Sequence, residues 1–337
     1  MRKRHFFFVA LLAAGLTMLP GTAPRPVDAQ ETTTLRIATL APRGSSWMRV
    51  FDAWNNTLRQ RTNNRLQLRV YAGGTQGDER DVIRKIRIGQ LDGAAVTSTG
   101  LSLIVRPVLV LQAPGVVESY QQLDRARAAM NDEFSQQFES NGVKLMGWGD
   151  VGEGRIFSNR AINRPQDLRS VRPWVWRDDS MFGTFLEVIG ANGVRLGVPE
   201  VLPALSTGQI DTVVASATAA SALQWHTRVT HVTQQANSFL IGATIISKQK
   251  YDSLPADLQQ ALTETSNQAH ETLVRRIRRD DQRYYRALTT RHGITAVDTS
   301  AHESEWRDAA RQTRERLAGR LYPRELMQRV MAAARGR

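Results

Sequence analysis

The sequence predicts an α/β fold with two domains, each built on a mixed, mostly parallel sheet that carries helices on both faces. Strand and helix patterns alternate along most of the chain, which is typical of such sheets. Two near-identical tetrapeptides, Gly-Gln-Leu-Asp at 89–92 and Gly-Gln-Ile-Asp at 208–211, each end a helical pattern and open an apolar strand. The length of 337 residues allows two domains of ordinary size. We therefore expect two similar α/β units.

The first unit shows five elements in turn. Alternating apolar residues predict a strand over 35–40, which a Pro-Arg-Gly-Ser-Ser loop follows. An apolar stripe then predicts a helix, with Trp47, Val50, Phe51, Trp54 and Leu58 on its buried face. A strand over 66–70, a helix around 82–86 and a strand over 93–98 complete the unit. This order predicts parallel strands joined by helical crossovers.

A cluster of glycines separates the two units. It follows a predicted helix over 120–141 and a predicted strand over 143–148, and consists of Gly147, Gly149, Gly152 and Gly154. The first three match Gly-x-Gly-x-x-Gly, but a dinucleotide site needs a helix directly after the glycines, and 155–158 favours an extended segment. The cluster is better explained as a flexible crossing between domains.

The second unit repeats the alternation. A turn over 165–168, a strand over 174–176, a helix over 181–189 closed by Gly190 and a helix over 201–205 lead to the second tetrapeptide. An apolar strand over 239–246 could return to the first unit, and a stripe over 255–290 predicts one helix more than ~50 Å long that braces both domains. A last helical segment starts at 302. We expect one domain over 30–152 and 241–275, and the other over 153–240 and 276–337.

The N-terminus has the pattern of a cleavable signal peptide over 1–29. Three basic residues precede an apolar run over 6–19, and Val-Asp-Ala at 27–29 forms a small-residue cleavage site. The run is shorter than the ~20 residues of a spanning helix. The chain contains no cysteine, which excludes disulfides, thiol catalysis and a lipoprotein anchor. We expect secretion to the periplasm, with cleavage near Ala29.

Composition argues against two other classes of function. The formal charge of +13 is basic, but the arginines are spread along the chain and alternate with acids on helical patterns, so we expect no nucleic-acid partner. The histidines show no metal-ligand spacing and no nucleophile motif, and no acid and base are placed to converge. We therefore expect no enzyme activity, no metal and no cofactor.

Small and polar residues follow each tetrapeptide, where a predicted strand ends. Thr97 and Ser98 end the stretch after the first, and Ala215 and Ser216 end the stretch after the second. In open α/β sheets, ligands bind beyond the carboxyl ends of the strands. Both copies therefore point to one ligand cleft between the units.

From Leu35 to about Asp298 the chain resembles the solute-binding proteins of tripartite ATP-independent periplasmic (TRAP) transporters, of the dicarboxylate-binding DctP type. The matching stretches, in order, are 42–47 (Pro-Arg-Gly-Ser-Ser-Trp), 77–80 (Gly-Asp-Glu-Arg), the first tetrapeptide, 154–155 (Gly-Arg) with 158–162, 165–168 (Pro-Gln-Asp-Leu), 190–192, 199–201 and the second tetrapeptide. The resemblance implies a two-domain periplasmic binding protein fold that closes over a solute. It also implies delivery to TRAP membrane permease subunits, with uptake driven by an ion gradient and without catalysis.

The chain departs from the family pattern at the carboxylate clamp. Family members usually hold a substrate carboxylate with an arginine and an asparagine, whose positions here are occupied by Trp174 and Ala215. Arg155 matches another arginine near the family site and remains. Arg172, two residues before the clamp position, is an alternative donor. Tryptophan is a poor replacement for a bidentate arginine, because indole offers one donor and no charge.

These departures predict an aromatic ligand site. The predicted ligand-binding residues are Arg155, Trp174, Trp148, Ala215, Thr97, Ser98, Trp47, Gln76, Trp225 and Trp176, with Phe182 as a further wall. Aromatic walls favour rings, acyl chains or quaternary amines, and a hydrophobic organic anion held by Arg155 is one option. The alternative for each tryptophan is ordinary core packing. The alternative function is an exported sensor or lipophilic carrier without a standard permease, for which a periplasmic helical-repeat protein is a candidate partner.

Overall fold

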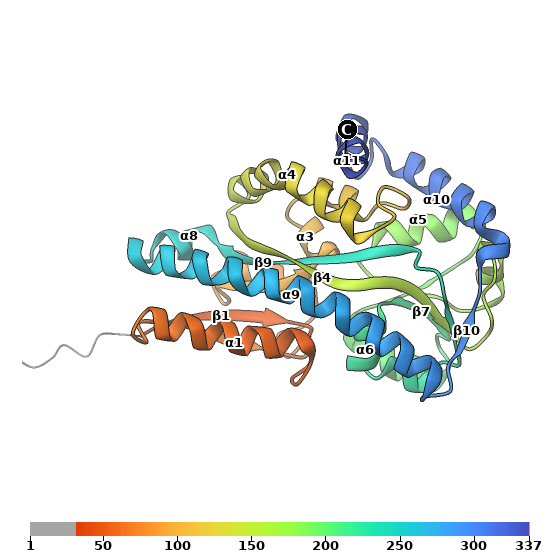
Figure 1. Ribbon diagram of the computed structural model, residues 1–337, viewed down its shortest axis with the longest axis horizontal. Helices are drawn as coiled ribbons and strands as arrows, with labels where there is room; N and C mark the ends of the chain where they lie inside the picture. Colours follow the sequence, from red (N-terminus) through yellow and green to blue (C-terminus); the bar gives the residue numbers. More distant parts are fainter. Residues whose placement is uncertain (1–31, 337) are drawn as a thin grey trace, which may run out of the picture. The chain divides into compact units, whose positions relative to one another are not determined.

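The computed structural model describes residues 32–336, so the predicted signal peptide lies outside the described residues. Figure 1 shows the arrangement of the elements. The strands are β1 (Thr33–Thr39), β2 (Leu66–Tyr71), β3 (Gly93–Thr97), β4 (Val143–Ser158), β5 (Trp174–Trp176), β6 (Val194–Leu196), β7 (Thr212–Ala215), β8 (His231–Thr233), β9 (Ser238–Ser247) and β10 (Thr295–Val297). The α-helices are α1 (Ser46–Arg61), α2 (Glu79–Arg87), α3 (Ser98–Ser102), α4 (Tyr120–Ser140), α5 (Ser180–Ile189), α6 (Val198–Thr207), α7 (Ala217–Ala222), α8 (Lys248–Asp252), α9 (Ala256–Thr290), α10 (Glu303–Leu317) and α11 (Arg324–Ala334). Four short 3₁₀ segments are η1 (Arg106–Gln112), η2 (Pro165–Ser170), η3 (Trp225–Arg228) and η4 (Ser300–His302).

The predicted α/β class, with a mixed sheet and helices on both sides, is confirmed. One continuous sheet runs in the order β10-β8-β4-β9-β3-β1-β2, with β7 paired to β4, and β5 and β6 form a separate pair. The β1–β2, β1–β3, β8–β10 and β5–β6 pairs are parallel, whereas β9 pairs antiparallel with β3 and β4, and β4 pairs antiparallel with β7 and β8. The two predicted sheets are thus joined through the long strands β4 and β9.

The glycine cluster lies inside β4 and is not the flexible crossing that the sequence predicts. β4 and β9 pair from Val143 to Gly154, with irregularities in register after Leu145 and after Asp150. Added Cβ atoms would come within 2.4 Å of the His270 ring at Gly147 and within 2.6 Å of the Ser216 Cβ at Gly152. The glycines therefore let neighbouring elements pack directly on the strand.

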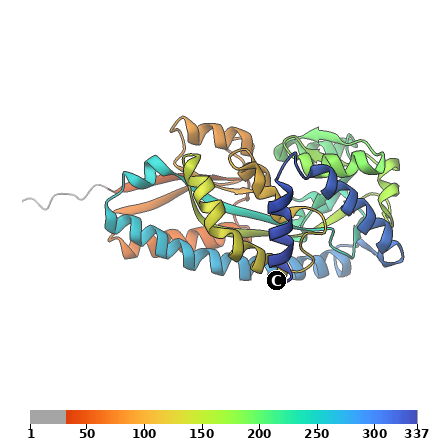
Figure 2. The ribbon, with the colours of Figure 1, turned by 90° about the horizontal axis from the view of Figure 1, so that it is seen from above.

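The predicted long helix is confirmed as α9, with bounds within one residue of those expected. It packs on α1 and β4 at one end and on α7 further along. Figure 2 shows it along one side of the molecule for most of the long axis. No helix among residues 32–336 is both long and apolar enough to cross a membrane.

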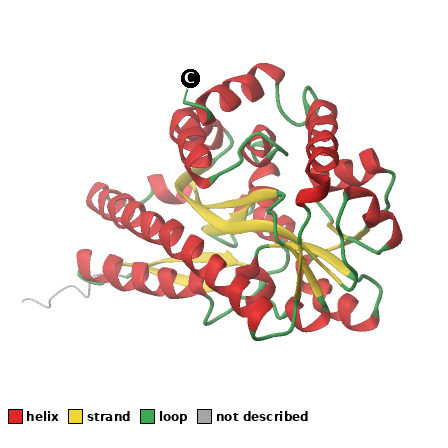
Figure 3. Cartoon of the chain, turned by 45° about the vertical axis from the view of Figure 1, so that its right-hand side comes forward, coloured by secondary structure: helices red, strands yellow, loops and turns green. Residues whose placement is uncertain are grey.

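The apolar core forms separate clusters along the molecule. One joins β3, η1, α4 and β9, and a second lies between β1, β2, α1 and α9. Two more surround β7 with α6 and η3, and β5 with α5 and α10. The last helix, α11, packs on α4 in the first cluster, whereas the predicted division assigns 276–337 to the second domain. Figure 3 shows how helices surround the sheet.

Candidate functional site

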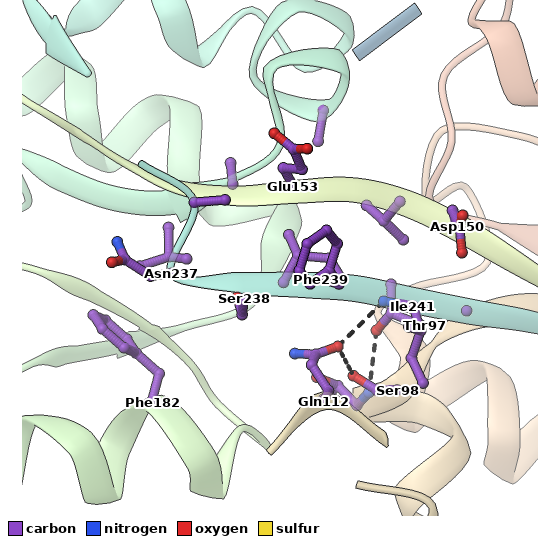
Figure 4. A pocket seen from close by; sticks show the side chains of 18 of the residues that line it. Thr97, Ser98, Gln112, Asp150, Glu153, Phe182, Asn237, Ser238, Phe239 and Ile241 are labelled. Atoms are coloured by element: carbon purple, nitrogen blue, oxygen red, sulfur yellow. Dashed lines mark hydrogen bonds between the residues drawn. The ribbon is translucent and has the colours of Figure 1, made fainter. Parts of the chain in front are cut away.

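The main cavity has a volume of about 870 Å³ and lies where several strands end. The carboxyl ends of β1, β3, β5 and β7 contribute Thr39, Thr97, Trp176 and Ala215, and the middle of β4 and the first half of β9 form the floor. Helices α5, α9 and α10 supply further wall residues. This is the place at which the repeated strand ends predict a ligand. Figure 4 shows part of the lining.

Three tryptophans build the aromatic end of the cavity. The Trp174 ring stacks on Trp176 with centroids 6.0 Å apart, and it meets Trp225 edge-on at 5.2 Å. Trp174 and Trp225 are 6% and 3% exposed. The indole Nε1 of Trp174 donates to the Leu196 carbonyl at 3.0 Å, so its only donor is already used. This end of the cavity therefore offers an apolar surface.

Polar side chains gather at the end of β3 and beside β9. The Gln112 Oε1 accepts from Ser98 Oγ at 2.8 Å and from the backbone N–H of Ile241 at 3.2 Å, as Figure 4 shows. Asn237 lies near the start of β9 and also lines the cavity. These groups are neutral, so this side of the cavity offers hydrogen bonds without charge.

Glu79 and His270 are buried titratable side chains of the wall. Burial raises the pKa of Glu79 to about 8, although its carboxyl accepts hydrogen bonds from the backbone N–H groups of Thr97 and Gly100 and from the Thr97 hydroxyl. Burial lowers the pKa of His270 to about 4, and its ring nitrogens contact Thr244 Oγ1 and the Ser266 carbonyl, each at 2.7 Å. Near pH 7 the cavity therefore meets a largely protonated Glu79 and a neutral His270.

Glu118 in the lining is exposed, and the remaining acidic residues have partners. Asp150 pairs with Arg127 and Arg278, both at 2.6 Å, and the Asp179 side chain caps the start of α5. Glu153 pairs with Arg155. At the rim, exposed Glu303 pairs with exposed Arg307 at 2.6 Å. Arg307 is the only lysine or arginine among the residues that line this cavity.

Seven of the ten predicted ligand-binding residues line the cavity, and Phe182 does so as well. The seven are Trp47, Thr97, Ser98, Trp174, Trp176, Ala215 and Trp225. They come from six elements that are distant in the sequence. No bound solute tests their role, so ligand contact by these residues stays a prediction.

Arg155, Trp148 and Gln76 do not line the cavity. The Arg155 guanidinium lies over the Tyr285 ring on α9, 4.4 Å from its centroid, and near Asp281. The Trp148 indole donates to Asn131 on α4 at 3.1 Å. Gln76 accepts from Lys85 at 3.1 Å. In each case a packed helix holds the side chain away from the cavity.

Arg172, the predicted alternative donor, is engaged by Asp211. Its backbone N–H donates to Asp211 at 2.7 Å, and its guanidinium pairs with the same carboxylate at 3.2 Å. The side chain is 59% exposed and does not line the cavity. Trp174 in β5 lines the cavity, whereas Arg172, which precedes β5, does not.

Several lining residues were not among the predicted set. They include Gln112, Asn237 and Phe239, together with Phe185 and Trp306 from α5 and α10. Gln112 ends the apolar run over 103–111, and Asn237 and Ser238 precede an apolar strand, so a polar residue at the boundary of an apolar element was the available signal. Their convergence depends on contacts between segments more than 100 residues apart.

The two sides of the cavity touch near the start of α2. The Asp78 carboxylate accepts from the Trp176 indole at 2.9 Å and from the Val198 backbone N–H at 3.2 Å. Arg80 pairs with Asp178. Among residues 32–336, no group of histidine, aspartate or glutamate side chains is placed to hold a metal ion.

Known proteins share this fold and sequence pattern. Residues 37–319 match the model of the family described as bacterial extracellular solute-binding protein, family 7. The 2,3-diketo-L-gulonate-binding periplasmic protein YiaO of Escherichia coli K12 is 25% identical over 241 residues, which are 68% of this chain and 70% of that protein.

Solved structures show the same arrangement. A sugar acid binding protein of Advenella mimigardefordensis, in complex with galactonate, has a TM-score of 0.85 and 14% identity, covering 91% of this chain and 99% of that one. A TRAP periplasmic solute-binding protein of Ralstonia eutropha H16 with bound 2-acetolactate has a TM-score of 0.84 and 19% identity, covering 90% and 99%. Because the family model covers most of the sequence, the chain belongs to the family 7 bacterial extracellular solute-binding proteins.

Proposed function

We propose that this protein is the periplasmic receptor of a TRAP transporter, and that it binds a small organic solute more apolar or aromatic than the usual carboxylates. It delivers this solute to a membrane permease. Membership of an extracellular solute-binding family and the signal-peptide pattern over 1–29 support the location.

The proposal is based on Trp174, which by alignment on the Pro-Gln-Asp-Leu turn takes the position of the family's clamp arginine. Its ring faces the cavity and its one donor is used by Leu196. Arg155 lies over Tyr285, and Arg172 pairs with Asp211. An ionised carboxylate moved into this aromatic end would lose hydration without gaining a cation, which is unfavourable.

The volume of the cavity and the solutes bound by similar proteins support a small organic molecule as the solute. A volume of about 870 Å³ suits a small organic molecule. One similar structure holds galactonate, another holds 2-acetolactate, and one from Bordetella pertussis is described as binding pyroglutamic acid. We propose a solute of comparable or somewhat larger size, with more apolar surface.

Binding is proposed to close two domains around the solute. The β1–β3 side and the β5–β7 side have separate apolar clusters, and β4, β9 and α9 connect them. The contacts from Asp78 and Arg80 to Trp176 and Asp178 bridge the cavity mouth. Closure by hinge motion would form these contacts around a bound solute.

A thermal-shift screen tests the proposal. We expect aromatic and aliphatic ring compounds to raise the melting temperature, and succinate and malate to leave it unchanged. Trp174→Ala should abolish the shifts by the ring compounds, because it removes the stacked wall at that end. A substitution of an exposed residue away from the cavity, such as Gln60→Ala, serves as the control. Strong stabilisation by C4 dicarboxylates that persists in Trp174→Ala would contradict an apolar site.

Mass spectrometry of the protein purified from its native periplasm gives the second test. A copurified ring-bearing or lipophilic molecule would agree with the proposal, whereas a dicarboxylate would contradict it. Deletion of the TRAP permease genes of the organism should abolish uptake of that molecule by cells. Uptake that persists without any permease would instead favour a sensor or carrier role.

A further inference from the structure

The polar side of the main cavity holds two carboxamide side chains whose amino groups have no partner among residues 32–336. They belong to Gln112, at the end of η1, and to Asn237, just before β9. Both line the cavity, and both are only partly exposed. The hydrogen bonds that these side chains already make show which of their donors a ligand can still use.

The orientation of the Gln112 amide follows from its neighbours. The backbone N–H of Ile241 can only donate, and it lies 3.2 Å from one end of the amide, which must therefore be the oxygen. The Ser98 hydroxyl donates to the same oxygen at 2.8 Å. The Nε2 group must then occupy the opposite end, which Figure 4 shows directed away from Ser98 and Ile241. Two N–H donors of Gln112 thus remain available at the cavity wall.

Asn237 provides an independent observation of the same kind. Its Nδ2 atom is buried and has no hydrogen-bond partner within the described part of the chain. Burying a donor without an acceptor is unfavourable, so such groups are normally satisfied by a ligand or an ordered water. Phe239, two residues further along, lies between this amide and the Ile241 end of the floor.

The charges around these donors disfavour an anionic ligand. The only arginine in the lining, Arg307, lies at the rim, is exposed and pairs with Glu303. Asp150 and Glu153 lie along the same floor, where Figure 4 shows both, and their arginine partners are already engaged with them. A carboxylate bound by Gln112 would lose hydration without meeting an unpaired cation in the lining, whereas a neutral oxygen acceptor does not carry this cost.

We propose that the solute is a neutral, oxygen-bearing apolar molecule, such as an amide or ketone, whose carbonyl oxygen accepts from Gln112 Nε2. Asn237 Nδ2 donates to a second acceptor where the solute has one. The apolar body of the solute lies against the tryptophans at the other end of the cavity. This assignment rests on the proposed receptor function and adds the group that selects the ligand. Ser98 acts as a positioning residue, because it holds the amide oxygen in place.

Isothermal titration with matched pairs tests the proposal on the full mature protein. The probes are benzamide and benzoate, phenylacetamide and phenylacetate, and cyclohexanecarboxamide and cyclohexanecarboxylate. We expect each amide to bind at least about tenfold more tightly than its acid. Gln112→Glu replaces the donor by a carboxylate oxygen and should weaken amide binding by about tenfold or more, the size expected for a lost hydrogen bond to a buried partner.

Controls separate this role from folding. Gln60→Glu adds the same charge on the exposed surface of α1 and should leave affinity unchanged. Ser98→Ala keeps Gln112 but removes one of the two groups that orient it, so we expect a smaller loss of amide affinity. If Gln112→Glu does not fold, then Ser98→Ala and Gln112→Met carry the test. Unchanged amide affinity in the variants that fold would overturn the role of Gln112.

The outcomes also separate this proposal from the receptor function. Acids that bind as tightly as their amides, or more tightly, would overturn the neutral class while the receptor function stands. Failure of all six probes to bind would overturn both the neutral class and the apolar site. Amide selectivity that Gln112→Glu abolishes supports both.

Discussion

Asp92 and Asp211, the aspartates of the two repeated tetrapeptides, make the same contacts in the two halves of the chain. The Asp92 carboxylate accepts from the backbone N–H and the guanidinium of Arg36, and its own N–H donates to the Arg36 carbonyl. Asp211 makes the corresponding three contacts with Arg172. Each aspartate thus ties the start of its strand to a neighbouring segment. The repeat is structural, and it explains why Arg172 is not free to bind a solute.

Glu79 gives a pH-dependent prediction at the same scale. Its pKa is about 8 in the folded protein against an ordinary value of 4.5, so the folded state keeps a proton that the unfolded chain releases. The stabilisation is fully present below pH 4.5 and is lost as the pH rises to 8, at about 1.4 kcal/mol per pH unit within that window. The protonated carboxyl can donate a hydrogen bond to the Thr97 hydroxyl oxygen, which lies 2.9 Å from Glu79 Oε2.

Urea unfolding at pH 5 to 8 checks this expectation by comparing the protein with Glu79→Gln. The variant should be less stable at pH 5, because its amino group meets a backbone donor, and its stability should change less with pH. The comparison isolates Glu79, since titration of His270 contributes with the opposite sign below pH 6.5 in both proteins. Parallel pH profiles would show that Glu79 is ionised in the folded state.

At the scale of elements, the glycine cluster of β4 is a pattern whose structural meaning the sequence alone does not give. Clustered glycines indicated a flexible crossing, because glycine is permissive, yet each one lies in a paired strand. Gly152 has a φ of +127°, and an added Cβ would lie 2.7 Å from the Asp281 Cγ on α9. The Asp281 carboxylate in turn accepts from the backbone N–H groups of Glu153 and Thr218. The glycines allow α9 and α7 to pack closely on β4, and no local sequence pattern shows this packing.

Gly152→Ala tests this interpretation. We expect a loss of about 3 kcal/mol or more in the free energy of unfolding, because backbone strain adds to a steric clash. Gly142→Ala is the matched control, since Gly142 also has a positive φ, of +81°, but an added Cβ there meets nothing within 4 Å. Its cost should be about 1 kcal/mol. Equal losses in denaturant titrations would mean that the contact with α7 and α9 contributes nothing.

At the scale of the whole molecule, the mouth of the cavity is held by contacts between α2 and the β5–α6 region. The Asp78 carboxylate caps α2 through Glu79 N–H and also accepts from Trp176. Arg80 adds an exposed ion pair with Asp178, worth at most about 1 kcal/mol. Because these contacts are few and weak, the arrangement can open at small cost.

Small-angle X-ray scattering checks this expectation without a ligand. The double variant Trp176→Phe with Arg80→Ala removes two of the three contacts and keeps the helix cap and the hydrogen bond from the Val198 N–H to Asp78. Its radius of gyration should exceed that of the unchanged protein. Arg84→Ala is the control, because Arg84 lies on the same helix and pairs only with Asp81 within it, at 3.8 Å. Identical scattering from all three proteins would contradict an opening controlled by these contacts.

The sequence by itself determined the α/β class, the order of the elements and the long helix. Periodicity and helix-ending glycines such as Gly190 and Gly208 are local properties, and both glycines adopt the left-handed conformation that their positions indicate. The repeated strand ends also located the cavity. Only the tertiary structure decided which side chains face it.

Arg155 and Ala215 show the reason. They are direct partners across β4 and β7, yet Ala215 lines the cavity while Tyr285 and Asp281 on α9 hold the Arg155 guanidinium elsewhere. Gln112 escaped prediction because its orientation depends on Ile241, 129 residues away along the chain. The orientation of a charged side chain is set by its ion-pair and hydrogen-bond partners. Those partners come from distant segments that only folding brings together.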